Sequence, residues 1–211
     1  MSSDQLMGDH TVEYPGYGEF KICSGNKMLK FRAESFLVKE PTTLEWLQSL
    51  EADSLLIDVG ANIGIYTIPA SLFHVKKVIA VEPEIKNYNM LLANLAANKI
   101  SPEKCEALPV AVSTQFRNQF TRLYLTKDEV GASCHQVGNN QDFKLRSLDG
   151  ERQYRNVFCT SLSQIVEQAS RDHDGPIHVK VDVDGIESDV CQSLFDDGII
   201  SKISSLQIEL N

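Results

Sequence analysis

The sequence predicts an α/β fold in which helices cover both faces of a doubly wound, mostly parallel sheet. Three apolar runs that end at or next to an acid carry this prediction: Leu55–Val59, Lys77–Val81 and Pro176–Val181. Segments with helical spacing separate the runs, and strands that alternate with helices are typical of parallel sheets. Because parallel strands end at one edge of the sheet, we expect their acids to meet in a ligand-binding crevice.

Residues 1–50 are predicted to form an N-terminal extension, and residues 51–211 the main domain. The segment Met1–Gly18 is polar and is expected to be irregular. Two short strands, Glu19–Cys23 and Met28–Ala33, are predicted to pair as a β-hairpin across the turn residues between them. The amphipathic segment Pro41–Leu50 is predicted as the first helix.

The later elements complete the α/β pattern. They are predicted, in chain order, as a helix at Glu84–Asn98, a strand at Ala107–Val112, strands at Phe120–Leu125 and Asn156–Cys159, and a helix at Leu162–Ala169 capped by Thr160. Strict alternation lapses between Ser113 and Val157, where the polar segment Gly131–Gly150 is too long for a turn. Loops of this length are typically lids or binding loops.

The turn after the first strand, Gly60-Ala61-Asn62-Ile63-Gly64, is the strongest indication of ligand binding. Its glycines let a ligand approach the backbone. A dinucleotide turn has a third glycine, which is missing here, and the carboxylate of Asp58 would repel a pyrophosphate but attract an ammonium or sulfonium group. Glu82 stands 22 positions after Gly60, which suits an acid that binds a ribose. Together these residues favour S-adenosylmethionine over NAD.

A second polar cluster follows the strand that begins near Pro176. Strand alternation places Lys180, Asp182 and Asp184 on one face, and Gly185 then ends the strand before a helical segment, Ile186–Leu194. Core packing does not explain a lysine and acids at the end of a buried strand, so we predict a functional role for Asp182.

The cluster also has a structural interpretation. Asp184 could cap the following helix, Glu187 could favour its N-terminal dipole, and Lys180 could pair with Asp182. Oxygen ligands suit Mg²⁺, so a divalent metal is possible, but no spacing in the sequence requires one.

Three motifs in this order resemble the FkbM family of S-adenosylmethionine-dependent methyltransferases, over roughly Glu40 to Asn211. They are Asp58–Gly64, Val81–Pro83 with Asn87 and Asn94 on the next helix, and Lys180–Glu187. The resemblance implies a class I methyltransferase (Rossmann-like) fold. It also implies O-methylation of a hydroxyl on a sugar, a polyketide or a similar small molecule.

The resemblance also implies roles for individual residues. The loop from Asp58 through Gly60, Ala61 and Asn62 to Gly64 would hold the methionine part of the cofactor, and Glu82 the ribose hydroxyls. Asp182 would lie beside the transferred methyl group, and Glu40 would reach the methionine end.

Methyl transfer to a hydroxyl requires alignment and removal of the hydroxyl proton. Asp182 is the first candidate for the base, or for a group that orients the substrate or a metal. His135 is the second candidate, although a lone histidine in such a segment is more typical of a surface. Lys180 could instead hold the carboxylates ionised.

Two features depart from the family pattern. Pro69 lies within the helix after the glycine turn and is expected to kink or restart it. The apolar strand Ser205–Leu210 would be the fifth of seven, so the sheet is expected to lack its last two strands. We expect this strand to form the sheet edge, either paired with a second copy in a homodimer or blocked by the segment Met1–Phe20.

The composition of the chain limits the kinds of partner that it is expected to bind. The net charge of −9 argues against nucleic acid and anionic membranes, which need a basic patch, so a small-molecule acceptor is expected. No run approaches the roughly 18 apolar residues of a membrane span. The five cysteines are scattered without a disulfide spacing, which is typical of reduced thiols and predicts a cytoplasmic protein.

Two other functions remain open from the sequence. A non-catalytic module could use the same pocket only to bind S-adenosylmethionine. An NAD-dependent oxidoreductase is the less favoured alternative, because the third glycine is missing.

Overall fold

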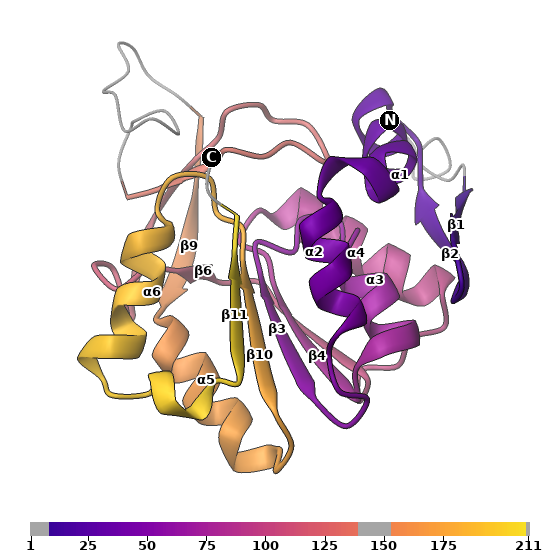
Figure 1. The fold of residues 1–211 in the computed structure, drawn as a ribbon. Coiled ribbons are helices and arrows are strands. Elements are labelled where there is room, and N and C mark those ends of the chain that lie inside the picture. Colours follow the sequence, from indigo (N-terminus) through magenta and orange to yellow (C-terminus); the bar gives the residue numbers. More distant parts are fainter. Residues whose placement is uncertain (1–8, 139–152, 210–211) are drawn as a thin grey trace.

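The five apolar segments predicted as buried strands form one parallel sheet in the computed structural model, which describes residues 9–138 and 153–209 (Figure 1). The strands lie in the order β11 (Ser205–Ile208), β10 (Ile177–Val181), β3 (Leu55–Val59), β4 (Lys77–Val81) and β5 (Cys105–Leu108). The predicted fold class is confirmed. The strand β11 belongs to the sheet, as its alternation predicted, and it lies at an edge, as expected. Pairing of this edge with a second copy stays a prediction, and Leu210 lies outside the described residues.

Alternation along the strands divides the core into two layers. Leu55, Ile57 and Val59 pack on one face with helices α5 (Leu162–Asp172) and α6 (Glu187–Asp196). Leu56 packs on the opposite face with helices α1 (Lys27–Lys39), α2 (Pro41–Gln48) and α4 (Ile85–Ala97). Figure 1 shows these two groups of helices on opposite sides of the sheet. Because the strands are parallel, the polar residues at their carboxyl ends lie at the same edge of the sheet.

The glycine turn is followed by a short helix that changes type at Pro69. Helix α3 spans Thr67–Pro69, and the π-helix η2 spans Ala70–His74. A proline has no N–H to donate to the preceding turn. The helix therefore ends and restarts at Pro69, as predicted.

The N-terminal hairpin exists, but its predicted strands were partly wrong. It pairs β1 (Asp9–Tyr14) with β2 (Gly18–Cys23), so β1 replaces much of the predicted irregular segment, and Met28–Ala33 lies in helix α1. The side chain of Asn26 accepts a hydrogen bond of 2.8 Å from the Leu29 N–H and caps this helix. Leu29, Ala33 and Phe36 then repeat at helical spacing and are buried.

A second sheet explains why the alternation lapses. Its four strands lie in the order β6 (Ala111–Val112), β9 (Tyr154–Thr160), β7 (Gln119–Tyr124) and β8 (Gln136–Val137). The predicted strand Ala107–Val112 is thus divided between two sheets at Pro109, which cannot donate to a ladder. The predicted cap Thr160 was wrong: Ser161 caps α5, and its hydroxyl and the Gln164 side chain form a capping box. A short helix, η3 (Ile200–Lys202), precedes β11.

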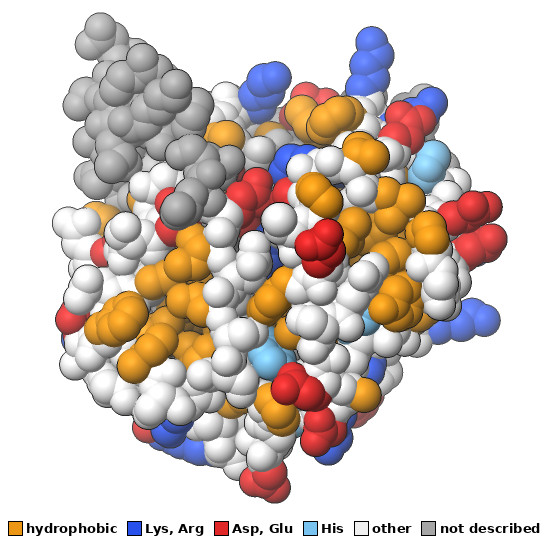
Figure 2. Space-filling model, viewed as in Figure 1, with side chains coloured by type: hydrophobic (Ala, Val, Ile, Leu, Met, Phe, Trp, Pro, Cys, Tyr) orange, Lys and Arg blue, Asp and Glu red, His pale blue; other side chains and the backbone are white. Residues whose placement is uncertain are grey.

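The surface mixes charged and apolar side chains. Figure 2 shows acidic and basic side chains scattered over one face, with hydrophobic groups over α6 and over the N-terminal helices. All five cysteines are free thiols. No helix within the described residues has both the length and the hydropathy needed to span a membrane.

Candidate functional site

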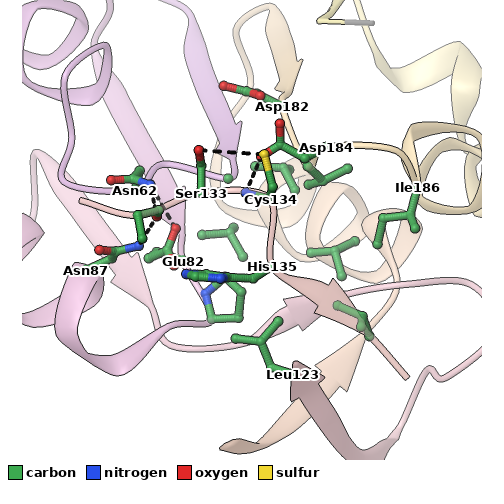
Figure 3. A pocket seen from close by; sticks show the side chains of 18 of the residues that line it. Asn62, Glu82, Asn87, Leu123, Ser133, Cys134, His135, Asp182, Asp184 and Ile186 are labelled. Carbon is green, nitrogen blue, oxygen red and sulfur yellow. Dashed lines mark hydrogen bonds between the residues drawn. The ribbon is translucent and has the colours of Figure 1, made fainter. Parts of the chain in front are cut away.

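A cavity of about 290 Å³ lies at the carboxyl ends of the parallel strands, where the sequence predicted a crevice. Glu82 follows β4 and Asp182 follows β10, and Figure 3 shows them at different sides of this larger cavity. The segment that carries Ser133, Cys134 and His135 crosses between them. A smaller cavity of about 20 Å³ adjoins it and shares Gly60, Asn62 and Asp182.

Glu82 is a buried carboxyl with capacity left for a ligand. Its Oε2 accepts a hydrogen bond of 2.8 Å from the Asn62 N–H, and its Oε1 accepts one of 2.8 Å from the Glu84 N–H. Burial raises the pKa of Glu82 to about 7. A carboxylate offers about four lone-pair sites, so each oxygen can accept a further hydrogen bond from a hydroxyl in the cavity.

Gly60 is required by the close approach of two strand ends. Its N–H and that of Ala61 both donate to the Val81 carbonyl at 3.0 Å, while the Asp182 N–H donates to the Val59 carbonyl at 3.0 Å. The φ of Gly60 is +85°, and a Cβ there would lie 1.8 Å from the Asp182 carbonyl oxygen. The glycine thus fixes the position of Asp182 as well as exposing backbone to a ligand.

Three carboxyl groups meet beside the glycine turn. Glu40, Asp182 and Glu209 each offer an oxygen within 4.8 Å of the others, and we call them the carboxylate cluster. The Lys39 ammonium lies 2.7 Å from Glu40 Oε1 and 3.6 Å from Glu209 Oε1, and the Lys180 ammonium lies 3.3 Å from Asp182 Oδ2. These lysines supply positive charge of the kind that a divalent ion would bring.

The members of the cluster differ in proton affinity. Burial raises the pKa of Glu209 to about 8, and the negative charge of Asp182 adds to the effect. Burial is the largest effect on the pKa of Asp182 and raises it, but the charges of Lys180 and Lys39, together with hydrogen bonds to the carboxylate, outweigh burial and hold this pKa below its usual range. Near neutral pH the cluster therefore carries a proton on Glu209, while Asp182 is ionised.

Asp58 lines only the smaller cavity, and Lys180 lines neither cavity. They are opposite each other in the register of β3 and β10, and both are buried. Asp58 Oδ2 accepts a hydrogen bond of 2.6 Å from the Thr67 hydroxyl. The Lys180 ammonium lies 5.0 Å from the centre of the Tyr66 ring. Its contact with Asp182 agrees with the structural interpretation of Lys180 as an ion-pair partner.

Residues 131–135 form a covering segment, four residues of which (132–135) line the larger cavity. The Ala132 carbonyl accepts hydrogen bonds from the side-chain amides of Asn62 at 2.9 Å and Asn87 at 3.0 Å. The Cys134 N–H donates to Asp184 Oδ2 at 2.7 Å, and both of these residues have positive φ. The suggested helix cap at Asp184 was therefore wrong: Ile186 occupies the cap position, and Asp184 holds the covering segment.

His135 lines the larger cavity from the covering segment. Its Nδ1 accepts a hydrogen bond of 3.2 Å from the Thr126 N–H. A main-chain N–H can only donate, so this contact places the proton of the neutral ring on Nε2. That tautomer donates a hydrogen bond and does not take up a proton at Nε2, which favours a binding role for His135.

The predicted site residues fall into three groups. Those that line the larger cavity are Gly60, Asn62, Glu82, His135 and Asp182. Those that line only the smaller cavity are Glu40, Asp58 and Ala61. Gly64 and Lys180 are among the lining residues of neither. A Cβ at Gly64 would lie 2.6 Å from the Leu91 side chain, so this glycine lets helix α4 pack closely.

Several lining residues were not predicted: Arg32, Lys39, Asn87, Cys134, Asp184 and Glu209. Arg32 and Lys39 belong to helix α1, part of which was predicted as a strand. Glu209 could have been found, because it follows β11 as Asp182 follows β10. Asn87 stood in the second motif but was assigned no role.

Solved structures match this chain at low similarity. An S-adenosylmethionine-dependent methyltransferase from Agrobacterium tumefaciens is 9% identical and covers 85% of this chain and 45% of its own, with a TM-score of 0.39. TYW2 from M. jannaschii, in complex with AdoMet, is 18% identical and covers 51% of this chain and 48% of its own, with a TM-score of 0.31. The chain thus spans less than half the length of either structure. No curated protein matches the sequence.

The family comparison is decisive. A family model described as the methyltransferase FkbM domain matches residues 58–211. The match begins at the acid before the glycine turn and includes Glu82, Asp182 and Glu209. Because it covers well over half of the 211 residues, the chain belongs to the FkbM family of methyltransferases.

Proposed function

We propose that this chain transfers a methyl group from S-adenosylmethionine to a hydroxyl of a small molecule. One observation carries the proposal. The larger cavity has on one side Glu82, a buried acid suited to binding ribose hydroxyls, and on the other side Asp182 and Glu209 of the carboxylate cluster. The donor set fits the cofactor: Glu82 can accept hydrogen bonds from the ribose hydroxyls, and Asp58 and Glu40 offer negative charge to the methionine ammonium.

When bound, S-adenosylmethionine supplies an activated methyl group on a positively charged sulfur. The chain then has to hold the two reactants in line and exclude water. The covering segment closes the cavity through the Asn62 and Asn87 contacts, while Asp182 and His135 can hydrogen-bond an acceptor. The cluster supports a hydroxyl acceptor in particular, because a hydroxyl must lose its proton as it reacts.

Calorimetric titration with S-adenosylmethionine, S-adenosylhomocysteine and NAD tests the cofactor assignment. We expect the first two to bind and NAD not to bind. Glu82→Ala should weaken both affinities by about 1–3 kcal/mol, because charge-assisted hydrogen bonds to the ribose are lost. Glu106→Ala, at an acid on β5 whose side chain is half exposed, should leave them unchanged. Unaltered binding by a folded Glu82→Ala protein would refute the assignment, and binding of S-adenosylmethionine without methyl transfer to any hydroxyl would indicate a binding module.

The pKa of Glu82, about 7, predicts a pH dependence. Only the ionised carboxylate can accept hydrogen bonds at both oxygens, so affinity should fall as pH drops from 8 to 6. Roughly a tenth of the groups stay ionised one unit below the pKa, so the loss should approach about tenfold. S-adenosylhomocysteine is the suitable ligand, because it keeps the ribose and lacks the sulfonium charge. Glu82→Gln should bind weakly at all pH values, and an unchanged pH profile in that variant would contradict the role of Glu82.

A further inference from the structure

Glu209 occupies a position equivalent to that of Asp182 on the neighbouring strand. Its N–H donates to the Val181 carbonyl at 3.0 Å, so it follows the end of β11 directly beside the end of β10. Its side chain lines the larger cavity together with Asp182. Both carboxyls therefore reach the end of the cavity where the acceptor hydroxyl is expected.

Glu209 has both acidic and basic groups around it. The carboxyls of Glu40 and Asp182 lie within 4.8 Å of it, and the ammonium of Lys39 lies 3.6 Å away. Lys180, Tyr66 and Asp58 are further ionisable groups whose charges act on the cluster. Glu209 Oε2 is buried, and no donor among the described residues gives it a hydrogen bond. Three carboxyl groups this close repel one another when all are ionised, so the arrangement itself favours a proton on one of them.

We propose that Glu209 takes the proton of the acceptor hydroxyl during methyl transfer, after releasing its own proton to solvent when the positively charged cofactor binds. Glu209 can have this role only if the proposed function holds.

The proposed cycle balances. Cofactor binding brings positive charge to the cluster, which favours the ionised carboxyl, and the Glu209 proton leaves to solvent. The acceptor oxygen then bonds to the methyl carbon as the carbon–sulfur bond breaks, and that bond's electron pair stays on sulfur. The hydroxyl proton moves to the Glu209 carboxylate. The products are a methyl ether, neutral S-adenosylhomocysteine and protonated Glu209, which is the state in which the cycle began.

Glu209 and Asp182 differ in proton affinity. Burial and the charge of Asp182 raise the pKa of Glu209 to about 8. A general base works best when its pKa lies near the pH of the reaction, and about 8 is close to neutral pH. The pKa of Asp182 is held low by Lys180, so Asp182 is the weaker base. Asp182 is then the positioning residue, because its charge raises the proton affinity of Glu209.

Proton release on cofactor binding tests the proposal without an acceptor. Binding is measured by calorimetry at pH 7.5 in two buffers of different ionisation enthalpy, which gives the number of protons released. About three quarters of a group with a pKa of 8 is protonated at this pH. S-adenosylmethionine should therefore release up to about 0.7 proton more than S-adenosylhomocysteine, which lacks the sulfonium charge. Glu209→Gln, which is nearly isosteric, should remove this difference, and Glu106→Gln should keep it.

Each outcome has a definite meaning. Equal proton release by the two ligands, or a difference that persists in Glu209→Gln, would overturn the role of Glu209 and leave the proposed function standing. Failure of both ligands to bind the unchanged protein would overturn the proposed function and, with it, the role of Glu209. As a second readout, methyl transfer to a panel of sugars and phenols should fall about 10²-fold in Glu209→Gln with cofactor affinity within a few-fold, and an unchanged rate would also refute the proposal.

Discussion

Gly60→Ala is expected to abolish cofactor binding and to destabilise the junction of β3 and β10. The new Cβ would lie 1.8 Å from the Asp182 carbonyl oxygen, and that oxygen is main chain and cannot rotate away. The residue also keeps a φ of +85°, which alanine adopts at a cost. The strand ends must separate, and this displaces Asp182 and the turn that faces the cavity. Urea unfolding and titration with S-adenosylmethionine measure the two effects.

Gly16→Ala is a matched control for this substitution. Gly16 has a φ of +84°, and a Cβ there meets nothing within 4 Å. It should therefore report the cost of the backbone conformation alone, about 1–2 kcal/mol of unfolding free energy, with cofactor affinity unchanged. Gly60→Ala should lose about 1–3 kcal/mol more, because of the overlap with the main chain. Equal losses in both variants, with binding retained in both, would show that the contact with Asp182 is not needed.

The central sheet and the acids at its edge could be predicted because they depend on local sequence. The alternation that separates Leu56 from Ile57 also places Lys180 on the face opposite Val179, and parallel topology brings strand ends together. The same rule applied to β11 identifies Glu209. Glu209 follows β11 as Asp182 follows β10, so strand alternation and parallel pairing are enough to place it at the cavity.

The covering segment belongs to the segment predicted as a lid or binding loop, but its contacts could not be predicted, because they join distant parts of the chain. Cys134 and Asp184 are 50 positions apart, and the Ala132 carbonyl is held by amides from two other elements. A main-chain carbonyl leaves no mark in the sequence. Asn62, Cys134 and Asp184 have positive φ without being glycine. Asn and Asp adopt this conformation more often than other residue types, but nothing in the residue type of Cys134 indicates its turn. Such strained positions are typical of functional sites, where the surrounding contacts hold them.

The burial of Asp58 shows a similar limit. Its place before the glycine turn predicted contact with the cofactor, yet the side chain is 1% exposed and accepts its hydrogen bond from Thr67. Burial raises the pKa of Asp58, while the nearby charge of Lys180 opposes that effect. The spacing of residues in the sequence can place a carboxyl near a ligand. Only the packing of the folded chain decides whether the carboxyl touches the ligand or acts on it through its charge at a distance.

Asp182→Asn is expected to lower the rate of methyl transfer by about 10³-fold while cofactor affinity stays within a few-fold. Two effects combine. The amide cannot hold an acceptor hydroxyl as strongly as a carboxylate does. Loss of the Asp182 charge also lowers the pKa of Glu209, which weakens it as a base. The rate of methyl transfer is measured as initial rates with methyl-labelled S-adenosylmethionine and a panel of sugars and phenols. The affinity for the cofactor is measured by calorimetry.

Three controls separate this role from a structural one. Asp196→Asn changes an exposed acid at the end of α6 and should leave the rate unchanged. Asp182→Glu keeps the charge beside the buried Lys180 and should recover part of the activity, whereas a purely steric role would give no recovery. Exhaustive chelation should not reduce the rate of the unchanged protein, because Lys39 and Lys180 already balance the cluster. Equal losses of rate and affinity in Asp182→Asn would make Asp182 a cofactor ligand, and activity restored by Mg²⁺ after chelation would assign the cluster to a metal.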